Sequence, residues 1–268
     1  APMYLAPDGT LLSAIDLPFT HILKPAGTAG FEMLPVVEWL CLELGRAAGF
    51  NVPDVALTAM PDGMAPALIV ERFDIRRGPE DRRRLALEDF CSILDLPASA
   101  KYDGTIERMA RGLRPLSTDP TADLEILFRR AVFAWLIADG DMHLKNLALL
   151  KIADADAKSF TSVRFAPLYD AVTTRVFPGL AGDRMALKLN GKDDRLTRGD
   201  FLTLARTIGV PQGVAEAAIA EVTTNLTNAV ETVRLPGFAA KSEAASAVQG
   251  QIMGLVRARC AALADEAS

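Results

Sequence analysis

Histidine and cysteine are scarce in this sequence, which has two histidines and three cysteines among 268 residues. Two histidines cannot build a multi-histidine metal site. The cysteines stand far apart and form no CxxC pair, so the sequence favours neither a disulfide framework nor a zinc knuckle. Such sparse use of cysteine is typical of a reducing compartment, and we expect a cytoplasmic protein.

The sequence also lacks an excess of basic residues and any long apolar run. Its net charge of −5 and pI of about 5.2 argue against a broad basic surface, so we expect no direct contact with nucleic acid. No apolar run reaches the length of a transmembrane helix, and the first residues show no signal-peptide pattern, so we expect no membrane contact. The one dense basic cluster, within 76–84, is diluted by acidic residues and is interpreted as a solvated loop.

Hydrophobic residues make up half of the sequence, which suffices for a sizeable core. In the first part, one helical pattern starts at Pro35 and lies among five strand-like runs, at 3–6, 10–15, 19–25, 55–60 and 66–73. The polar segment 75–84 then resembles a linker in composition.

Helical patterns predominate after that segment, at 87–95, 105–113, 121–138, 198–209, 211–233 and 242–264. They surround two short strand-like runs, at 147–151 and 161–168. We therefore predict an α+β fold with two lobes, as in protein kinases. The small sheet lobe would cover 1–74, and the larger, mostly helical lobe would cover 75–268.

Two polar segments carry the chemistry, Gly140–Asn146 and Ala166–Asp170. Phosphoryl transfer needs a carboxylate near the attacking hydroxyl, and an amide oxygen and a second carboxylate to hold magnesium. Asp141, Asn146 and Asp170 offer these groups in the order of a kinase-like catalytic loop. Each alone would be a turn residue. Asp139 competes for the catalytic position, but only Asp141 stands five residues before Asn146.

The same loop contains His143 and Lys145. His143 could donate a hydrogen bond to the transferred phosphoryl group or brace the loop, and both interpretations stay open. Lys145 could neutralise phosphate charge, but a solvated loop lysine is favoured.

The first lobe offers a candidate nucleotide site. Lys24 interrupts an apolar strand, where it either reaches water or binds phosphates, and Glu38 on the predicted helix could hold it in place. Glu71, Arg72 and Phe73 precede the linker, where an adenine would meet the chain. The alternative is an edge strand with alternating faces, which we favour for Arg72.

Several separated motifs occur together in a specific order: Thr20–Lys24, Phe50–Asp54, Val70–Asp74, a looser stretch from Leu87–Cys91 to Lys101-Tyr102, Asp141–Asn146, Pro167–Asp170 and Met185–Lys192. Together they resemble the HipA family, the serine/threonine-kinase toxins of bacterial toxin–antitoxin systems. The likeness extends over nearly the whole chain.

The resemblance implies roles for particular residues. By position, Asp141 becomes the catalytic base and Lys24 the phosphate-binding lysine, while Asn146 and Asp170 become magnesium ligands. Glu71 and Phe73 fall where the family's chain passes the adenine. ATP and magnesium would be the cofactors, a protein with a serine or threonine hydroxyl the substrate, and a DNA-binding antitoxin protein the partner.

One departure from the family concerns its glycine-containing phosphate loop, which precedes the lysine strand. The only glycine before Lys24 is Gly9, in a turn, so the first lobe is expected to be incomplete. The chain would be the later part of a longer protein, or another chain would supply the loop. Two other functions stay open. Aminoglycoside and choline kinases use a loop similar to Gly140–Asn146, and a non-catalytic kinase-like binding module could lack the phosphate loop.

Overall fold

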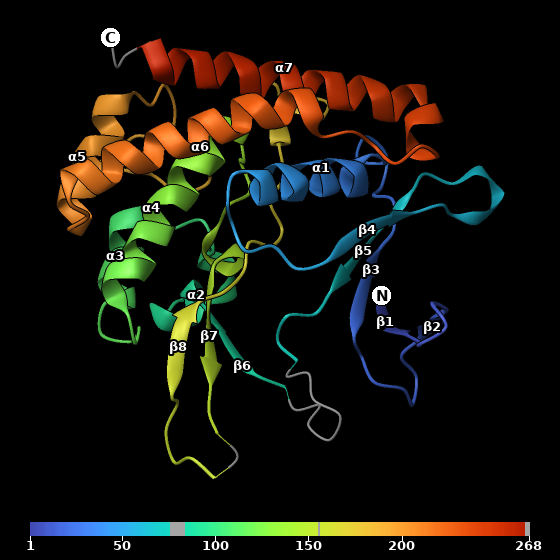
Figure 1. The fold of residues 1–268 in the computed structure, drawn as a ribbon, viewed down its shortest axis with the longest axis horizontal. Coiled ribbons are helices and arrows are strands. Elements are labelled where there is room, and N and C mark those ends of the chain that lie inside the picture. Colours follow the sequence, from blue (N-terminus) through green and yellow to red (C-terminus); the bar gives the residue numbers. More distant parts are fainter. Residues whose placement is uncertain (76–83, 155, 266–268) are drawn as a thin grey trace.

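The first sheet has five antiparallel strands in the order β2-β1-β3-β5-β4 (Figure 1). This computed structural model describes residues 1–75, 84–154 and 156–265. The strands are β1 Pro2–Leu5, β2 Leu11–Ser13, β3 His21–Lys24, β4 Val55–Thr58 and β5 Ala67–Glu71. Four of them lie within the predicted runs, and β1 starts one residue before its run at 3–6. Strand β5 is interior, between β3 and β4. The edge-strand interpretation of 66–73 is therefore wrong, because the chain after β4 returns on its inner side.

Helix α1, Leu34–Ala47, covers one face of this sheet and also packs against α6 and α7 (Figure 1). Pro35 lies in its first turn, as predicted, where its missing N–H leaves no bond unmade. Val36, Val37 and Leu40 are fully buried. The sequence therefore places apolar side chains of α1 both toward the sheet and toward the helices behind it. This packing holds Glu38, on the same helix, beside Lys24 at the end of β3.

A second sheet has the order β6-β7-β8, with β6 Ala86–Asp89, β7 Ala148–Ile152 and β8 Ser162–Phe165. The prediction of a helix over 87–95 is wrong in its first half, because Ala86–Asp89 pairs with β7 and only Phe90–Ile93 forms a helix, α2. The residues of β6 are good helix formers, but pairing with a distant strand satisfies their backbone groups instead. Asp89 then caps α2 by accepting from the Ser92 N–H at 3.0 Å.

The remaining helices agree with the predicted ranges to within one or two residues. They are α3 Ile106–Leu113, α4 Pro120–Ile137, α5 Arg198–Ile208, α6 Gln212–Thr232 and α7 Glu243–Asp265. Side-chain caps define three of the starts, since Thr105, Asp119 and Thr197 each accept a backbone N–H of the following turn. The expected linker at 75–84 lies mostly outside the described residues, and the lobe boundary at 74 stays a prediction.

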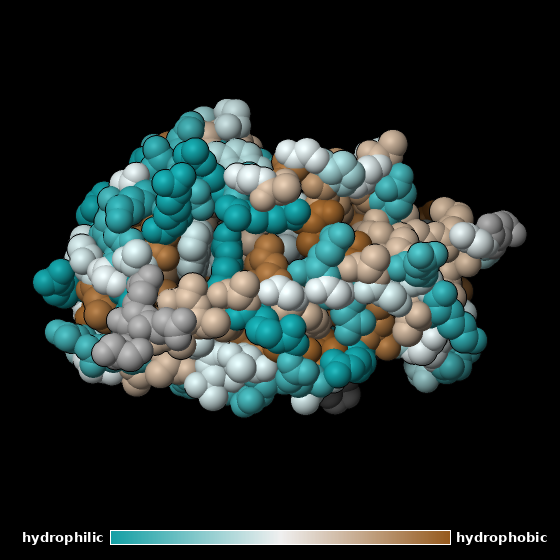
Figure 2. Space-filling view, turned by 90° about the horizontal axis from the view of Figure 1, so that it is seen from above, coloured by the Kyte–Doolittle hydropathy of each residue, from teal (hydrophilic) through white to brown (hydrophobic). Residues whose placement is uncertain are grey.

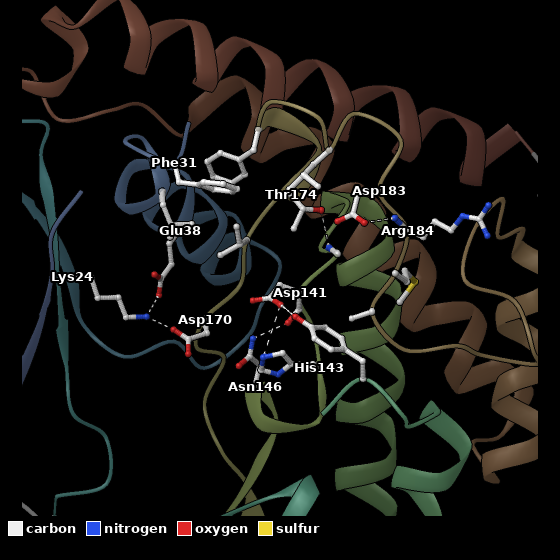
Figure 3. Close-up of a pocket in the computed structure, with 18 residues that line it drawn as sticks. Lys24, Phe31, Glu38, Asp141, His143, Asn146, Asp170, Thr174, Asp183 and Arg184 are labelled. Atoms are coloured by element: carbon white, nitrogen blue, oxygen red, sulfur yellow. Dashed lines mark hydrogen bonds and ion pairs between the residues drawn. The ribbon is translucent and has the colours of Figure 1, made fainter. Parts of the chain in front are cut away.

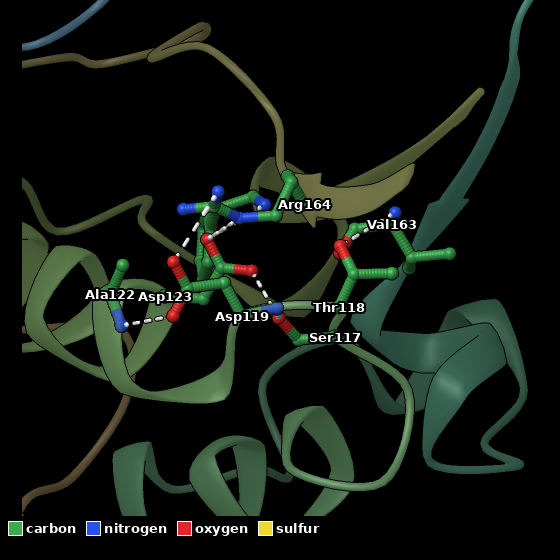
Figure 4. A network of polar contacts seen from close by, with 8 residues as sticks. Ser117, Thr118, Asp119, Ala122, Asp123, Val163 and Arg164 are labelled. Carbon is green, nitrogen blue, oxygen red and sulfur yellow. Dashed lines mark hydrogen bonds and ion pairs between the residues drawn. The ribbon is translucent and has the colours of Figure 1, made fainter. Parts of the chain in front are cut away.

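A buried carboxylate joins α4 to β8 (Figure 4). Asp123 has no exposed surface, and it accepts hydrogen bonds from Ser117 Oγ at 2.5 Å, Arg164 Nε at 3.1 Å and the Phe165 N–H at 3.2 Å. Three donors compensate for the loss of water around the charge. The network holds the start of α4 against β8, the strand from which the chain continues to Asp170.

The face of the molecule seen from above is a mixture of hydrophilic and hydrophobic residues (Figure 2). The exposed residues of α7 are mostly alanine and glycine, with a few polar side chains such as Glu243, Gln251 and Arg257. On its inner side, Ala245, Ile252, Val256, Cys260 and Leu263 are buried at helical spacing. In the described ranges, none of the helices combines the length and the apolar character needed to cross a bilayer.

Candidate active site

A cleft of about 730 Å³ lies between the first sheet with α1 and the loop after α4 (Figure 3). Its walls come from segments far apart in the sequence. Six of the eight predicted site residues line it together: Lys24, Glu38, Asp141, His143, Asn146 and Asp170. The fold thus brings together the residues that the two polar segments and the lysine strand offered separately.

The local backbone of the loop decides which carboxylate reaches the cleft. Helix α4 ends at Ala138, which adopts a left-handed conformation with φ of 56°. Gly140 then passes so close to its neighbours that a Cβ on it would lie 2.1 Å from Asp183 Oδ2 and 2.4 Å from Thr174 Oγ1, so a larger residue would force both side chains to move. The chain turns Asp139 into the core, whereas Asp141 faces the cleft with 42% of its side chain exposed.

Asp139 supports this loop from the protein core. Its carboxylate accepts the Asp141 N–H at 3.0 Å. Burial raises the pKa of Asp139 from its ordinary value of 3.8 to about 8, and the charges of Asp141 and Asp170 add to the rise. Backbone donors oppose the rise but do not cancel it. Of the two carboxyl groups, only that of Asp141 lines the cleft, and the catalytic role of Asp141 stays a prediction.

Three side chains contact Asp141. Tyr102 Oη donates to Asp141 Oδ1 at 2.6 Å, and His143 Nε2 lies 3.9 Å from the same oxygen. The amide nitrogen of Asn146 donates to the backbone oxygen of Asp141 at 2.8 Å. His143 is buried, and burial lowers its pKa, so the ring is neutral near pH 7. It packs edge-on against Tyr102, which is a bracing position, and any contact with phosphate stays a prediction.

Lys24 lies between two carboxylates on the other side of the cleft. Its Nζ donates to Glu38 Oε1 at 2.6 Å and also to Asp170 Oδ1. Although burial lowers the pKa of Lys24, the two carboxylates outweigh burial and hold that pKa above its ordinary value. Burial raises the pKa of Glu38 to about 7, with the attraction of Lys24 opposing the rise and the charge of Asp170 adding to it. The predicted Lys24–Glu38 contact is present.

A second cavity of about 290 Å³ adjoins the cleft. Glu71 and Phe73, predicted beside the adenine, line it with Tyr169, whose ring centroid lies 5.5 Å from that of Phe73. Lys24, Glu38 and Asp170 line both cavities. A ligand with a flat ring in the small cavity could therefore extend the groups attached to that ring past Lys24 and into the cleft.

Arg72, which also borders this cavity, has a structural role. Its guanidinium pairs with Asp74 at 2.6 Å and stacks over the Phe19 ring at 4.1 Å. The alternative favoured for Arg72, a residue of an edge strand, is wrong because β5 lies between β3 and β4.

The oxygen donors of the cleft fit a magnesium ion bound with a nucleotide. Within the described residues, no group of three or more His, Cys, Asp and Glu side chains forms a metal cage. Magnesium usually takes only one or two protein carboxylates and completes its shell with phosphate oxygens and water. Because Asn146 uses its amide nitrogen for the loop, its amide oxygen is the atom left for a cation, and the Asp170 carboxylate is 42% exposed in the same cleft.

The structure adds aromatic residues that sequence reasoning left without a role. Tyr102 and Phe31 line the cleft, and Tyr169 lines the small cavity. The motifs containing Tyr102 and Tyr169 were visible, but neither side chain has a local pattern that indicates its target. Lys145, interpreted as a loop lysine, is exposed and pairs with Asp89 at 2.5 Å.

Comparison with known sequences gives one consistent result. The family model of the HipA-like C-terminal domain matches residues 8–230. Y4mE of Sinorhizobium fredii, named as a candidate kinase, is 31% identical over 222 residues, which are 80% of this chain and 50% of that protein. A candidate kinase of Haemophilus influenzae is 22% identical over 72% of this chain and 61% of its own length. The chain thus spans about half the length of such relatives.

Two solved structures have the same fold. HipA of Shewanella oneidensis, determined in complex with HipB and operator DNA, aligns with a TM-score of 0.77 over 97% of this chain and 62% of that one, at 19% identity. The proinflammatory kinase CtkA of Helicobacter pylori aligns with a TM-score of 0.61 over 92% of this chain and 88% of its own, at 15% identity. The predicted two-lobed, kinase-like α+β fold is confirmed.

Proposed function

The chain belongs to the family of HipA-like C-terminal domains, and from that premise we propose that it is the catalytic region of an ATP- and magnesium-dependent protein kinase acting on serine or threonine. One observation carries the proposal. A single cleft gathers Asp141, Asn146, Asp170 and Lys24 from three separate segments, with a small aromatic-lined cavity beside it. This is the set of groups that phosphoryl transfer requires.

The nucleotide would lie across the two cavities. Its base would lie in the small cavity against the paired rings of Phe73 and Tyr169, and its phosphates would reach Lys24, which Glu38 holds in place. Asn146 and Asp170 would hold magnesium. When bound, Mg-ATP supplies the phosphoryl group and the ion offsets the charge of its oxygens.

Asp141 acts on the acceptor. Its carboxylate would accept a hydrogen bond from the serine or threonine hydroxyl and orient that oxygen toward the γ-phosphorus. It would take the hydroxyl proton as the new oxygen–phosphorus bond forms and the bond from that phosphorus to the departing ADP breaks. Its exposed position beside Asn146 suits this role. His143 and Tyr102 line the same end of the cleft, so the acceptor meets Asp141 beside two aromatic rings.

For the whole protein we propose an antitoxin partner. The support is the Shewanella oneidensis HipA, which was solved together with HipB. Mixing this protein with the product of an adjacent antitoxin-like gene should yield a stable complex in size-exclusion chromatography, and two separate peaks would contradict the proposal.

The decisive experiment offers labelled ATP and magnesium with a cell lysate, and separately with aminoglycosides and amino alcohols. We expect label on protein, recovered as phosphoserine or phosphothreonine. Asp141→Ala should reduce the rate by about 10²–10⁴, the usual loss for a general base. Asp156→Ala, an exposed change in the loop after β7, is the control and should match the wild type.

Two outcomes would contradict the proposal. Label on small molecules alone would indicate a small-molecule phosphotransferase, which uses a loop similar to 140–146. Near-normal turnover by Asp141→Ala would remove Asp141 from the role of base.

A further inference from the structure

Tyr102 is held firmly against the loop that carries Asp141. It follows a short 3-10 turn, Ala98–Ala100, and the backbone oxygen of Lys101 accepts the Leu144 N–H at 3.0 Å. Gly104 lies so close to Leu144 that a Cβ on it would be 2.6 Å from Leu144 Cδ2. The backbone on both sides of Tyr102 is therefore fixed relative to the catalytic loop, although the tyrosine itself is 47% exposed toward the cleft.

The tyrosine hydroxyl selects one of the two carboxylate oxygens of Asp141. Tyr102 Oη donates to Oδ1 at 2.6 Å, and the nearest nitrogen of His143 is 3.9 Å from that same Oδ1. The Tyr102 ring packs edge-on against the His143 ring, with centroids 5.2 Å apart at 77°. Oδ1 thus accepts a hydrogen bond from Tyr102, whereas His143 lies beyond hydrogen-bond distance and braces the Tyr102 ring, and Oδ2 is the atom left for an incoming hydroxyl.

The hydroxyl of Tyr102 is a donor at every pH at which the protein would be assayed. Burial, together with the hydrogen bond to Asp141, raises the pKa of Tyr102 well above its ordinary value of 10. Tyr102 therefore cannot serve as the base itself near neutral pH. Since its proton points to Asp141, its effect on a reaction must pass through that carboxylate.

We propose that Tyr102 is a positioning residue of the proposed phosphoryl transfer, and that its hydroxyl fixes the Asp141 carboxylate so that Oδ2 meets the attacking hydroxyl. This inference rests on the proposed function. A carboxylate on a single rotatable side chain would otherwise sample orientations in which neither oxygen faces the acceptor. Positioning of this kind affects the chemical step and leaves nucleotide binding at the far side of the cleft unchanged.

The test compares the steady-state kinetics of Tyr102→Phe with those of the wild type over a range of Mg-ATP concentrations up to saturation. The change keeps the ring and its contact with His143 and removes only the hydroxyl. A hydrogen bond to a charged group corresponds to about a 10- to 100-fold effect, so we expect kcat to fall by that factor while KM for ATP is unchanged. Tyr4→Phe is the matched control. It makes the same chemical change in β1, away from the cleft, and should behave as the wild type.

A double-variant experiment separates positioning from a merely structural role. If Tyr102 acts through Asp141, adding Tyr102→Phe to Asp141→Ala should cause no further loss of kcat. A full additional loss in that background would overturn the inference, as would a Tyr102→Phe variant with wild-type kcat or one whose KM for ATP rises. A wild-type protein that transfers no phosphate would overturn the proposed function, and the inference with it. An active wild type with an equally active Tyr102→Phe variant would overturn the inference alone.

Discussion

Asp139 and Asp141 are separated by one glycine and have opposite surroundings. Asp139 is 3% exposed and supports the loop from the core, whereas the side chain of Asp141 is 42% exposed in the cleft. The difference arises because the chain turns sharply at Ala138 and Gly140. Two identical side chains thus have different surroundings, one holding the loop and one facing the cleft.

The raised pKa of Asp139 predicts how stability depends on pH. The folded protein keeps this carboxyl protonated up to about pH 8, whereas the unfolded chain releases the proton near 3.8. The contribution is therefore fully present below the unfolded value and is lost as pH rises through the folded one. We expect the Tm of the wild type to fall relative to that of Asp139→Asn between about pH 5 and pH 8, and the difference to level off above.

Thermal unfolding of both proteins without ligand measures this effect. The asparagine keeps an acceptor for the Asp141 N–H and cannot ionise, so it is the matched reference. A constant difference in Tm across the range would contradict the assignment of a raised pKa.

At the scale of elements, α1 is packed so closely that its glycine is required. A Cβ on Gly45 would lie 2.2 Å from Leu168 Cδ2 and 3.4 Å from Phe133 Cζ. Leu168 is buried and stands two residues before Asp170. The fit between α1 and this segment therefore also sets the position of a predicted magnesium ligand.

Two glycine substitutions in helices should have opposite effects. Gly45→Ala should lower the free energy of unfolding by about 1–3 kcal/mol, because overpacking outweighs the gain in helix propensity. Gly254→Ala in α7 meets no atom within 4 Å of the new Cβ and should raise it by about 0.5–1 kcal/mol. Urea unfolding of each variant would measure both changes. Stabilisation by Gly45→Ala would show that Leu168 moves aside without cost.

The elements also show what a sequence can predict. The long helices have sequence-local causes, namely apolar periodicity and caps such as Thr105 and Asp119, so their limits were predicted closely. Strand β6 was not predicted, because its partner lies about 60 residues away and its own residues favour a helix. The spacing of Asp141 and Asn146 is local and was visible. The contact of Tyr102 with Asp141 joins positions 39 residues apart and depends on the tertiary fold.

At the scale of the whole molecule, the shared wall of Lys24, Glu38 and Asp170 connects the two cavities. Residues from the sheet, α1 and the segment after β8 meet there, so a nucleotide across this wall would link both parts of the fold. Binding to the folded state alone must stabilise it by mass action.

We therefore expect Mg-ATP to raise the Tm of the wild type. At a concentration 100 times the Kd, the stabilisation would be about 2.7 kcal/mol. Lys24→Met should lose most of this increment, since Met cannot bind phosphate, while Lys158→Met, an exposed change in the loop after β7, should keep it. Because the Tm of each variant is compared with and without Mg-ATP, a change in the stability of the unliganded variant does not affect the measured increment. No increment for the wild type at millimolar Mg-ATP would favour a non-catalytic binding module.

The packing of α1 has a consequence for control. Kinases can be silenced when the helix that carries the lysine-bound glutamate is displaced. Here α1 packs on one side against the first sheet and on the other side against α6 and α7, and several of its side chains are fully buried. Displacing α1 outward would expose these buried apolar side chains to water and disrupt the hydrophobic core. For the proposed kinase we therefore expect inhibition to act by blocking the entrance of the cleft or by displacing a loop, and not by moving α1.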